Sequence, residues 1–335
     1  MERRLPRRFA AVFLLAVMVL FPGSPSRAAE NPEKPLTLYT AMTATTPQIP
    51  LWAAIRSGWP AGRELVVEYW KTLDDLRGLV LAGKGDLWVG HLEGFAQAAL
   101  RGAPVTLVAV TGWKKFYFVT TDYADSPRTL EDIAEALRKE GLPLAVAPQD
   151  SPAIGILEEL ARRGGPSFAI EPMPSQQAML SMLRGSRSCV LLPEPLVSAL
   201  LAKKSSLRIA ASLEIEISGR FGGSGRLPLV GVAVKSSLVR DNPLLVRELV
   251  RAMEKAALEL AGRPAEEAVA VLPQSVREAF DSKVLEASLS RDLIFVLPAH
   301  EARAEALSFL RMVLREGRDS AGLTLPETFF LPDPE

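Results

Sequence analysis

The sequence of 335 residues has little of the chemistry that disulfides, metal sites and reactive thiols need. It contains one cysteine, so no C-x-x-C motif can occur, and its two histidines, His91 and His300, are too far apart for an H-E-x-x-H motif. Cys189 can form no disulfide within the chain, and the apolar run from Cys189 to Leu192 predicts a buried structural thiol. We therefore expect no metal, no cofactor and no cysteine chemistry.

Neither sign of charge is in excess, because 39 basic residues face 39 acidic ones. Residues 1–28 hold five of the basic residues and one of the acidic residues, so the chain without them has a formal charge of −4. This charge makes nucleic acid an improbable partner. The remaining length suits two domains that each bury a core.

A long apolar stretch is also missing. The run from Phe9 to Phe21 is shorter than the roughly 20 residues of a membrane-spanning helix. Four arginines precede this run and the small residue Ala28 follows it, an arrangement typical of a secretory signal peptide. We predict cleavage after Ala28, with an uncleaved anchor as the alternative. With no cysteine there to take a lipid, we expect a soluble periplasmic protein.

Short β-like runs alternate with amphipathic helical ones along the rest of the chain. Two T-x-x-D capping boxes, at Thr72 and Thr129, predict helices that end near Gly83 and Gly141. Further helices are expected over 94–101, 151–164 and 242–260, then to about Arg315, followed by a loose tail. Strands are expected over 36–39, 65–69, 87–89, 105–110, 144–147, 168–171, 188–192 and 229–234. This alternation predicts an α/β fold with largely parallel sheets.

The sequence supports neither a P-loop nor a serine-hydrolase motif. Residues 78–85 match a P-loop except that Gly85 replaces the Ser or Thr that binds magnesium, and residues 79–82 belong to an amphipathic helix. No G-x-S-x-G elbow supports a serine nucleophile.

Six segments in order carry a family resemblance. They are the Thr- and Pro-rich turn at 43–50, LAGKGDLWVG at 81–90, GAPVTLV at 102–108, QDSP at 149–152, LLPEP at 191–195 and SSLVRDNP at 236–243. Together they resemble the nitrate, sulfonate, taurine and thiamine-precursor binding proteins of bacterial ABC importers, over roughly residues 36 to 272. One departure is Ser188-Cys189, where that family usually has an Asp-Ala pair.

The resemblance implies a type II periplasmic-binding-protein fold, with a ligand cleft between two lobes joined by two chain crossings. We place the crossings near Asp122 and Pro228, so that residues 29–122 and 228–335 form lobe one and residues 123–227 form lobe two. The implied function is capture of a small molecule for delivery to a membrane permease, by a protein expected to be a monomer. The alternative is an enzyme on the same fold, of the pyrimidine-synthesis or menaquinone-pathway kind, which works in the cytoplasm.

Candidate ligand residues follow the strands, because parallel α/β sheets bind ligands at the carboxyl ends of their strands. They are Thr43, Thr45, Thr46, Trp70, Lys71, His91, Glu93, Trp113, Gln149, Asp150, Ser151 and Glu194. Several have structural alternatives: Ser151 as a helix cap, Trp113 and Tyr117 as packing residues, His91 as a structural histidine, and Glu194 as a salt-bridge partner.

The same strand ends carry no arginine, whereas two tryptophans, a histidine and two glutamates stand there. This set favours a planar, neutral or weakly cationic heterocycle over a nitrate or sulfonate, with Trp70 covering its face. Helix N-termini and Lys71 could still hold an anion.

Overall fold

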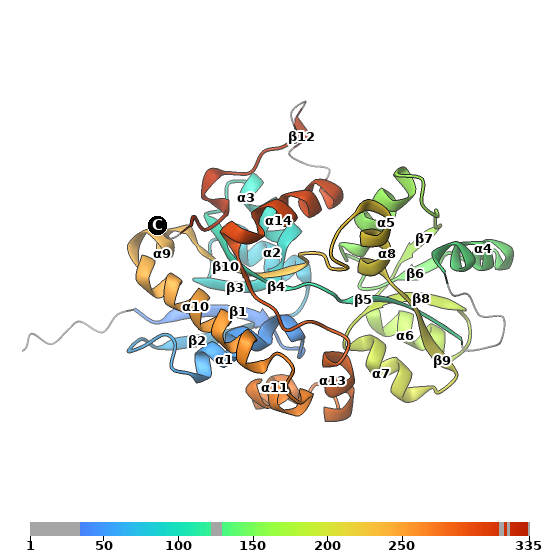
Figure 1. The fold of residues 1–335 in the computed structure, drawn as a ribbon, viewed down its shortest axis with the longest axis horizontal. Helices are drawn as coiled ribbons and strands as arrows, with labels where there is room; N and C mark the ends of the chain where they lie inside the picture. The colour runs from blue at the N-terminus through green and yellow to red at the C-terminus, as the bar shows by residue number, and fades with distance from the viewer. Residues whose placement is uncertain (1–33, 122–128, 315–317, 320–321, 334–335) are drawn as a thin grey trace, which may run out of the picture. The chain divides into compact units, whose positions relative to one another are not determined.

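The structure is a computed structural model that describes residues 34–121, 129–314, 318–319 and 322–333 (Figure 1). The predicted signal peptide and Asp122, where we expect the first crossing, lie outside the described residues. Among the helices of the described ranges, none is long and apolar enough to cross a membrane.

The first part of the chain contains five strands among four helical segments. They are β1 (Leu36–Ala41), η1 (Thr46–Gln48), α1 (Ile49–Arg56), β2 (Leu65–Trp70), α2 (Leu73–Leu81), β3 (Leu87–His91), α3 (Leu92–Leu100), β4 (Val105–Gly112) and β5 (Phe116–Thr121). The middle part contains α4 (Leu130–Glu140), β6 (Leu144–Val146), α5 (Ala153–Arg162), β7 (Ile170–Pro172), α6 (Ser175–Leu183), β8 (Cys189–Pro193), α7 (Leu196–Lys203), β9 (Leu207–Ser212) and α8 (Leu213–Phe221).

The last part is mostly helical. It contains β10 (Val230–Lys235), α9 (Ser236–Asp241), α10 (Pro243–Leu260), α11 (Ala265–Val271), α12 (Gln274–Arg277), α13 (Ser282–Leu289), β11 (Leu297–Pro298), α14 (Ala299–Val313), β12 (Arg318–Asp319), β13 (Gly322–Leu323) and η2 (Glu327–Phe329).

One sheet has six strands in the order β11-β4-β10-β3-β1-β2. Strand β1 pairs in parallel with β2 and β3, but β10 runs antiparallel to both β3 and β4. The expectation of a largely parallel sheet is therefore wrong at its centre. A strand buried on both faces reads as a continuous apolar run in either direction, so the sequence of β10 does not reveal its orientation.

The second sheet has five strands in the order β7-β6-β8-β5-β9. Strand β6 pairs in parallel with β7 and β8, whereas β5 runs antiparallel to β8 and β9. Strands β5 and β9 are absent from the elements that we expect from the sequence. The whole second sheet lies in sequence between β4 and β10, which are neighbours in the first sheet.

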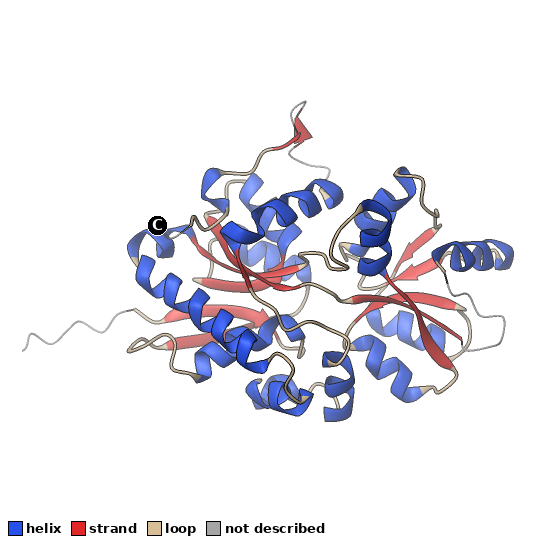
Figure 2. Ribbon diagram, viewed as in Figure 1, coloured by secondary structure: helices blue, strands red, loops and turns tan. Residues whose placement is uncertain are grey.

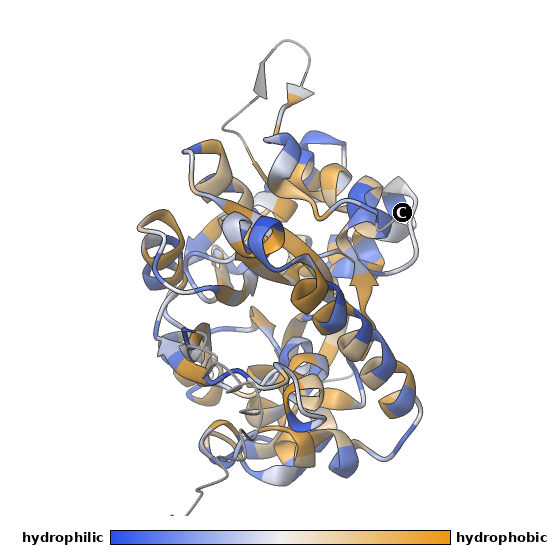
Figure 3. Ribbon diagram, turned by 90° about the vertical axis from the view of Figure 1, so that its left-hand side faces the viewer, coloured by the Kyte–Doolittle hydropathy of each residue, from blue (hydrophilic) through white to orange (hydrophobic). Residues whose placement is uncertain are grey.

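Helices flank both sheets (Figure 2). The strands supply fully buried side chains such as Leu38, Val108, Leu191 and Val232. The helix surfaces alternate between hydrophilic and hydrophobic residues (Figure 3), as expected of helices that cover a sheet on one side only. Cys189 belongs to this buried set, as predicted, and burial raises the pKa of its thiol.

Both capping boxes are confirmed. The backbone N–H of Asp75 donates to Thr72 Oγ1 at 3.1 Å while the N–H of Thr72 donates to Asp75 Oδ2 at 3.0 Å. The same reciprocal pair joins Thr129 and Asp132. Helix α4 ends at Gly141 in the left-handed region, with a φ of 67°.

The expected loose tail is wrong for the residues around η2. Phe329 and Phe330 are buried, and the N–H of Leu331 donates to the carbonyl oxygen of Leu107 at 2.9 Å. Thr106 Oγ1 also donates to the carbonyl oxygen of Thr328 at 2.8 Å. Burial of the apolar Phe-Phe-Leu sequence against β4 accounts for this order.

Candidate functional site

The candidate site lies at the edge of the first sheet where β3 and β4 end. His91 and Gly112 both pair with Val230 of β10, one from each side, so these two strand ends lie at the same edge. Segment η1 packs against this edge, because a Cβ atom added to Gly112 would lie 2.6 Å from Pro47 Cγ. Residues from four separate stretches of the chain therefore meet here.

Three polar side chains, Lys115, His91 and Glu93, lie next to one another at that edge. Lys115 Nζ lies 3.2 Å from His91 Nε2, and His91 Nδ1 lies 3.4 Å from Glu93 Oε1. An ammonium group only donates hydrogen bonds, so His91 Nε2 accepts and Nδ1–H points to Glu93. Burial and the charge of Lys115 lower the pKa of His91. The imidazole is therefore neutral at pH 7.

Glu93 is buried with its charge poorly compensated. Its side chain is 6% exposed, and neither carboxylate oxygen accepts a hydrogen bond from any residue that the structure describes. Arg77 Nη2 of α2 lies 3.9 Å from Oε1, beyond hydrogen-bond distance. A buried carboxylate in this state is costly unless something further binds to it.

Glu214 fixes the backbone that carries Lys115. Its Oε1 accepts the N–H groups of Lys115 and Phe116, each at 2.8 Å, and its Oε2 accepts the hydroxyl of Ser212 at 3.0 Å. The residue is fully buried, and burial raises the pKa of its carboxyl against these hydrogen bonds. Glu214 thus holds the connection between β4 and β5 in place.

Asp292 supplies a third carboxylate near Lys115. Burial raises the pKa of Asp292 to about 7, although the N–H of Leu293 donates to its Oδ1 at 2.7 Å. Burial also lowers the pKa of Lys115, against the attraction of Asp292, Glu93 and Glu214. Perturbed titration of several neighbouring groups is common at functional sites.

The second sheet contributes to the same region. Asp150 follows β6 and is half-buried, and its charge only partly opposes the burial that lowers the pKa of His91. Ser151 is buried, and its Oγ accepts the N–H of Ala153 at 3.2 Å, so it acts as a cap for α5. The structure therefore brings Asp150 near His91, whereas the hydroxyl of Ser151 is used locally.

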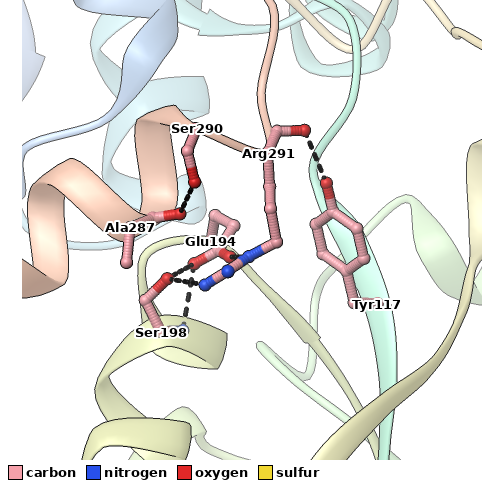
Figure 4. Close-up of polar contacts among 6 residues, drawn as sticks. All are labelled: Tyr117, Glu194, Ser198, Ala287, Ser290 and Arg291. Atoms are coloured by element: carbon pink, nitrogen blue, oxygen red, sulfur yellow. Dashed lines mark hydrogen bonds and ion pairs between the residues drawn. The ribbon is translucent and has the colours of Figure 1, made fainter. Parts of the chain in front are cut away.

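Glu194 forms a buried ion pair with the C-terminal part of the chain (Figure 4). Arg291 Nε lies 2.8 Å from Glu194 Oε1, and Ser198 donates to Glu194 Oε2 through its N–H and its hydroxyl. The hydroxyl of Tyr117 in β5 donates to the carbonyl oxygen of Arg291 at 2.9 Å. Glu194 therefore forms a salt bridge with Arg291, which agrees with its alternative role as a salt-bridge partner.

Trp113 is fully buried and packs against other side chains, which agrees with its alternative role as a packing residue. The Arg226 guanidinium lies 4.4 Å from its ring centroid, the Phe295 ring lies at 5.5 Å, and its Nε1–H donates to the carbonyl oxygen of Phe295 at 2.9 Å. Trp70 is half-buried at the end of β2, with its Nε1–H donated to the carbonyl oxygen of Val89 at 3.1 Å.

The other predicted site residues lie around this region with varied exposure. Lys71 and Gln149 are exposed. Thr43 is also exposed, and its carbonyl oxygen accepts Gln48 Nε2 at 3.1 Å. Thr45 is half-buried and Thr46 is buried.

Four charged residues of the candidate site are not among those predicted from the sequence: Lys115, Glu214, Arg291 and Asp292. Lys115, Glu214 and Asp292 each stand beside an apolar residue, as in Trp113-Lys-Lys-Phe116 and Asp292-Leu-Ile-Phe295, whereas Arg291 lies between Ser290 and Asp292. A charge in an apolar segment was therefore the available signal. Within the described ranges, no group of three or more His, Cys, Asp or Glu side chains is placed to hold a metal ion.

Replacing Asp292 with asparagine should change how stability depends on pH. The pKa of Asp292 is about 7 in the folded protein and about 3.9 in an unfolded chain. As pH rises from about 4 to 7, the unfolded state loses this proton first, so the carboxyl contributes progressively less stability. The variant should gain stability relative to the unmodified protein across this window. Urea unfolding at several pH values measures it.

The groups that face Asp292 are Lys115, Glu214 and Thr46, and all three stay in place in this variant. Asp241→Asn is a suitable control, because Asp241 is 55% exposed. A stability difference for Asp292→Asn that stays constant between pH 4 and 7 would contradict the burial argument.

No protein-family model and no curated protein sequence matches the chain. Solved structures do match. An ABC transporter from Parabacteroides distasonis superposes with a TM-score of 0.67 at 18% identity, covering 90% of this chain and 99% of that one. The periplasmic aliphatic sulphonate binding protein SsuA of Escherichia coli gives 0.62 at 14% identity, covering 83% and 89%.

The periplasmic nitrate-binding protein NrtA of Synechocystis PCC 6803 also gives 0.62 at 14% identity, covering 83% of this chain and 80% of that one. The chain therefore shares its fold with these periplasmic binding proteins, as its sequence resemblance predicts.

Proposed function

We propose that the protein is the solute-binding component of an ABC importer, which captures a small molecule and delivers it to a membrane permease. One observation carries this proposal: polar groups from both sheets converge on one buried region, in a fold shared with importer binding proteins. The ends of β3 and β4 supply His91 and Lys115, and the end of β6 supplies Asp150.

The proposed lobes are built around the two sheets. Strands β1 to β4, β10 and β11 belong to lobe one, and β5 to β9 belong to lobe two. We place the first crossing at residues 113–115, before β5, instead of near Asp122 as expected from the sequence, because β5 pairs with β8 and β9. The second crossing, expected near Pro228, stays between α8 and β10. A solute that contacts both lobes binds the closed form better than the open form, so it shifts the population toward closure. The permease then recognises the closed form.

Binding is favoured here over catalysis. The matching structures are described as transport components, with sulphonate or nitrate as the solute of some. We propose that this chain is exported and cleaved after Ala28, as the sequence predicts. A location outside the cytoplasm agrees with the importer role and not with the enzyme alternative.

Native mass spectrometry of the freshly purified protein tests the proposal first, because a tightly held solute should appear as an added mass. Adding that solute to stripped protein should lower the radius of gyration and raise the melting temperature. By mass action, a solute at 100 times its Kd contributes about 2.7 kcal/mol to the free energy of unfolding. Small-angle scattering and thermal melting measure the two effects.

Scattering curves that superimpose with and without a solute shown to bind would contradict the closure mechanism. Turnover of the solute to a product of different mass would contradict the binding role and favour the enzyme alternative.

A further inference from the structure

After β10 the chain contacts lobe two again, in addition to the two crossings already placed. Helices α10 and α11 pack against α1 of lobe one, but α13 packs against α7 of lobe two. A groove of about 750 Å³ lies between α7 and α13, lined by Ala199 and Ala202 on one side and by Val284 and Ala287 on the other. The two helices are therefore only partly packed together, and the residues after α13 complete the attachment.

Arg291, two residues after α13, is held by three residues of lobe two (Figure 4). Its Nε lies 2.8 Å from Glu194 Oε1, and its Nη2 donates to the hydroxyl oxygen of Ser198. The hydroxyl of the buried Tyr117 donates to its carbonyl oxygen at 2.9 Å. Side chain and backbone are both bound, so Arg291 is an anchor on lobe two.

Phe295, four residues later, is held in the same way by lobe one. Its carbonyl oxygen accepts the Nε1–H of Trp113, the residue that follows β4, at 2.9 Å. The guanidinium of Arg226 lies 4.8 Å from the Phe295 ring centroid and 4.4 Å from that of Trp113. Leu297 then pairs with Val110 of β4. Phe295 is therefore an anchor on lobe one.

The segment between these anchors runs beside the first crossing in the opposite direction, because Arg291 contacts Tyr117 and Phe295 contacts Trp113. A rotation of one lobe against the other must change backbone dihedral angles in every connecting segment. While both anchors hold, only residues 292–294 can absorb that rotation in the C-terminal segment.

The second crossing is better able to bend. It contains Gly222, Gly223 and Gly225, whose φ values are 79°, 146° and 75°. Glycine changes backbone conformation at little steric cost, and an added Cβ atom at Gly222 would meet nothing within 4 Å. The C-terminal segment contains no glycine between its anchors, so it resists rotation more than the second crossing does.

We infer that residues 291–295 form a third connection between the lobes, a strap that limits how far the solute-free protein opens, and that Arg291 positions it. This inference rests on the proposed function, because it treats the two sheets as lobes that move. The strap also contains Asp292, whose charge acts on Lys115 in the first crossing. Rotation of the lobes therefore also moves charged groups of the candidate site.

Small-angle scattering of the solute-free protein tests the strap. Arg291→Ala removes the anchor on lobe two, so the radius of gyration should rise by about 1 Å, from the roughly 20 Å of a compact chain of this length. Arg291→Lys keeps a positive charge opposite Glu194 and should give a smaller increase. Arg240→Ala is the matched control, because Arg240 pairs with Asp241 on the surface of α9, and it should give none.

Tyr117→Phe tests the same anchor if Arg291→Ala does not fold. It removes one hydroxyl and keeps the buried ring, so it should raise the radius of gyration in the same direction by a smaller amount. Melting curves identify the folded variants, and scattering is recorded well below their transitions. A residue that only stabilises the fold would lower the melting temperature without enlarging the folded protein.

A radius of gyration that neither Arg291→Ala nor Tyr117→Phe changes would overturn the inference. An equal increase in Arg240→Ala would do so too. If the strap fails in this way while a co-purified solute closes the unmodified protein, the proposed function stands. An increase confined to the strap variants, in a protein that no solute binds or closes, would support the strap and count against the proposed function.

Discussion

Gly231→Ala should lower the free energy of unfolding by about 3 kcal/mol, the upper part of the usual range for overpacking a core. Gly231 lies in β10, between β3 and β4. An added Cβ atom would lie 2.7 Å from the carbonyl oxygen of Ala109 and 2.7 Å from Leu107 Cδ1. The carbonyl belongs to a strand paired on both sides, so it cannot move away without loss of sheet hydrogen bonds. Urea unfolding measures the change.

Gly78→Ala is the matched control, because it makes the same substitution where there is room. Gly78 is exposed in α2, and an added Cβ atom there would meet nothing within 4 Å. Alanine in a helix is favoured over glycine by roughly 0.5–1 kcal/mol, so this variant should be more stable than the unmodified protein. Equal effects at the two positions would contradict the packing argument at β10.

Arg291→Ala should lower the free energy of unfolding by about 2 kcal/mol. Removing one partner of a buried ion pair typically costs about 3 to 5 kcal/mol, since the other charge is left without compensation. The side chain of Glu194 is only 2% exposed, whereas that of Arg291 is 29% exposed. Glu194 also keeps the two donors of Ser198, and both facts place the expected loss below the usual range.

A second substitution separates the charge from the packing. Glu194→Gln in the Arg291→Ala background removes the unpaired carboxylate, so the double variant should regain part of the lost stability. Arg240→Ala is the surface control: Arg240 pairs with Asp241 in water, where such pairs contribute about 0–1 kcal/mol. An Arg291→Ala effect no larger than that of Arg240→Ala would show that the buried pair contributes little.

Local signals in the sequence predicted the two helices with capping boxes and most strands, but not α1, α6, α7 and α8. The reciprocal hydrogen bonds at Thr72 and Thr129 depend on residues three positions apart, so the T-x-x-D pattern is sufficient to place them. The direction of β10 and the pairing of β5 with β8 and β9 depend on partners far away in the sequence. Periodicity within a segment carries no information about those partners.

The candidate site also contains both residues that the sequence predicts and residues that it does not. His91 and Glu93 could be predicted because each follows a strand, and the ends of parallel strands share an edge. Arg291 and Asp292 could not, because they belong to neither a strand nor a helix. Only the packing of the C-terminal segment brings Arg291 to Glu194 and Asp292 close to Lys115.

The position of β10 also sets the order in which the chain can fold during synthesis. Strand β4 has no pairing with β3 and joins it in the sheet only through β10, which ends at Lys235. Ribosomes add roughly 5–20 residues per second, so β4 waits on the order of ten seconds for its central neighbour. During that time the five-stranded sheet, whose strands are contiguous in sequence, can form on its own. The six-stranded sheet is therefore completed last, after the segment that interrupts it.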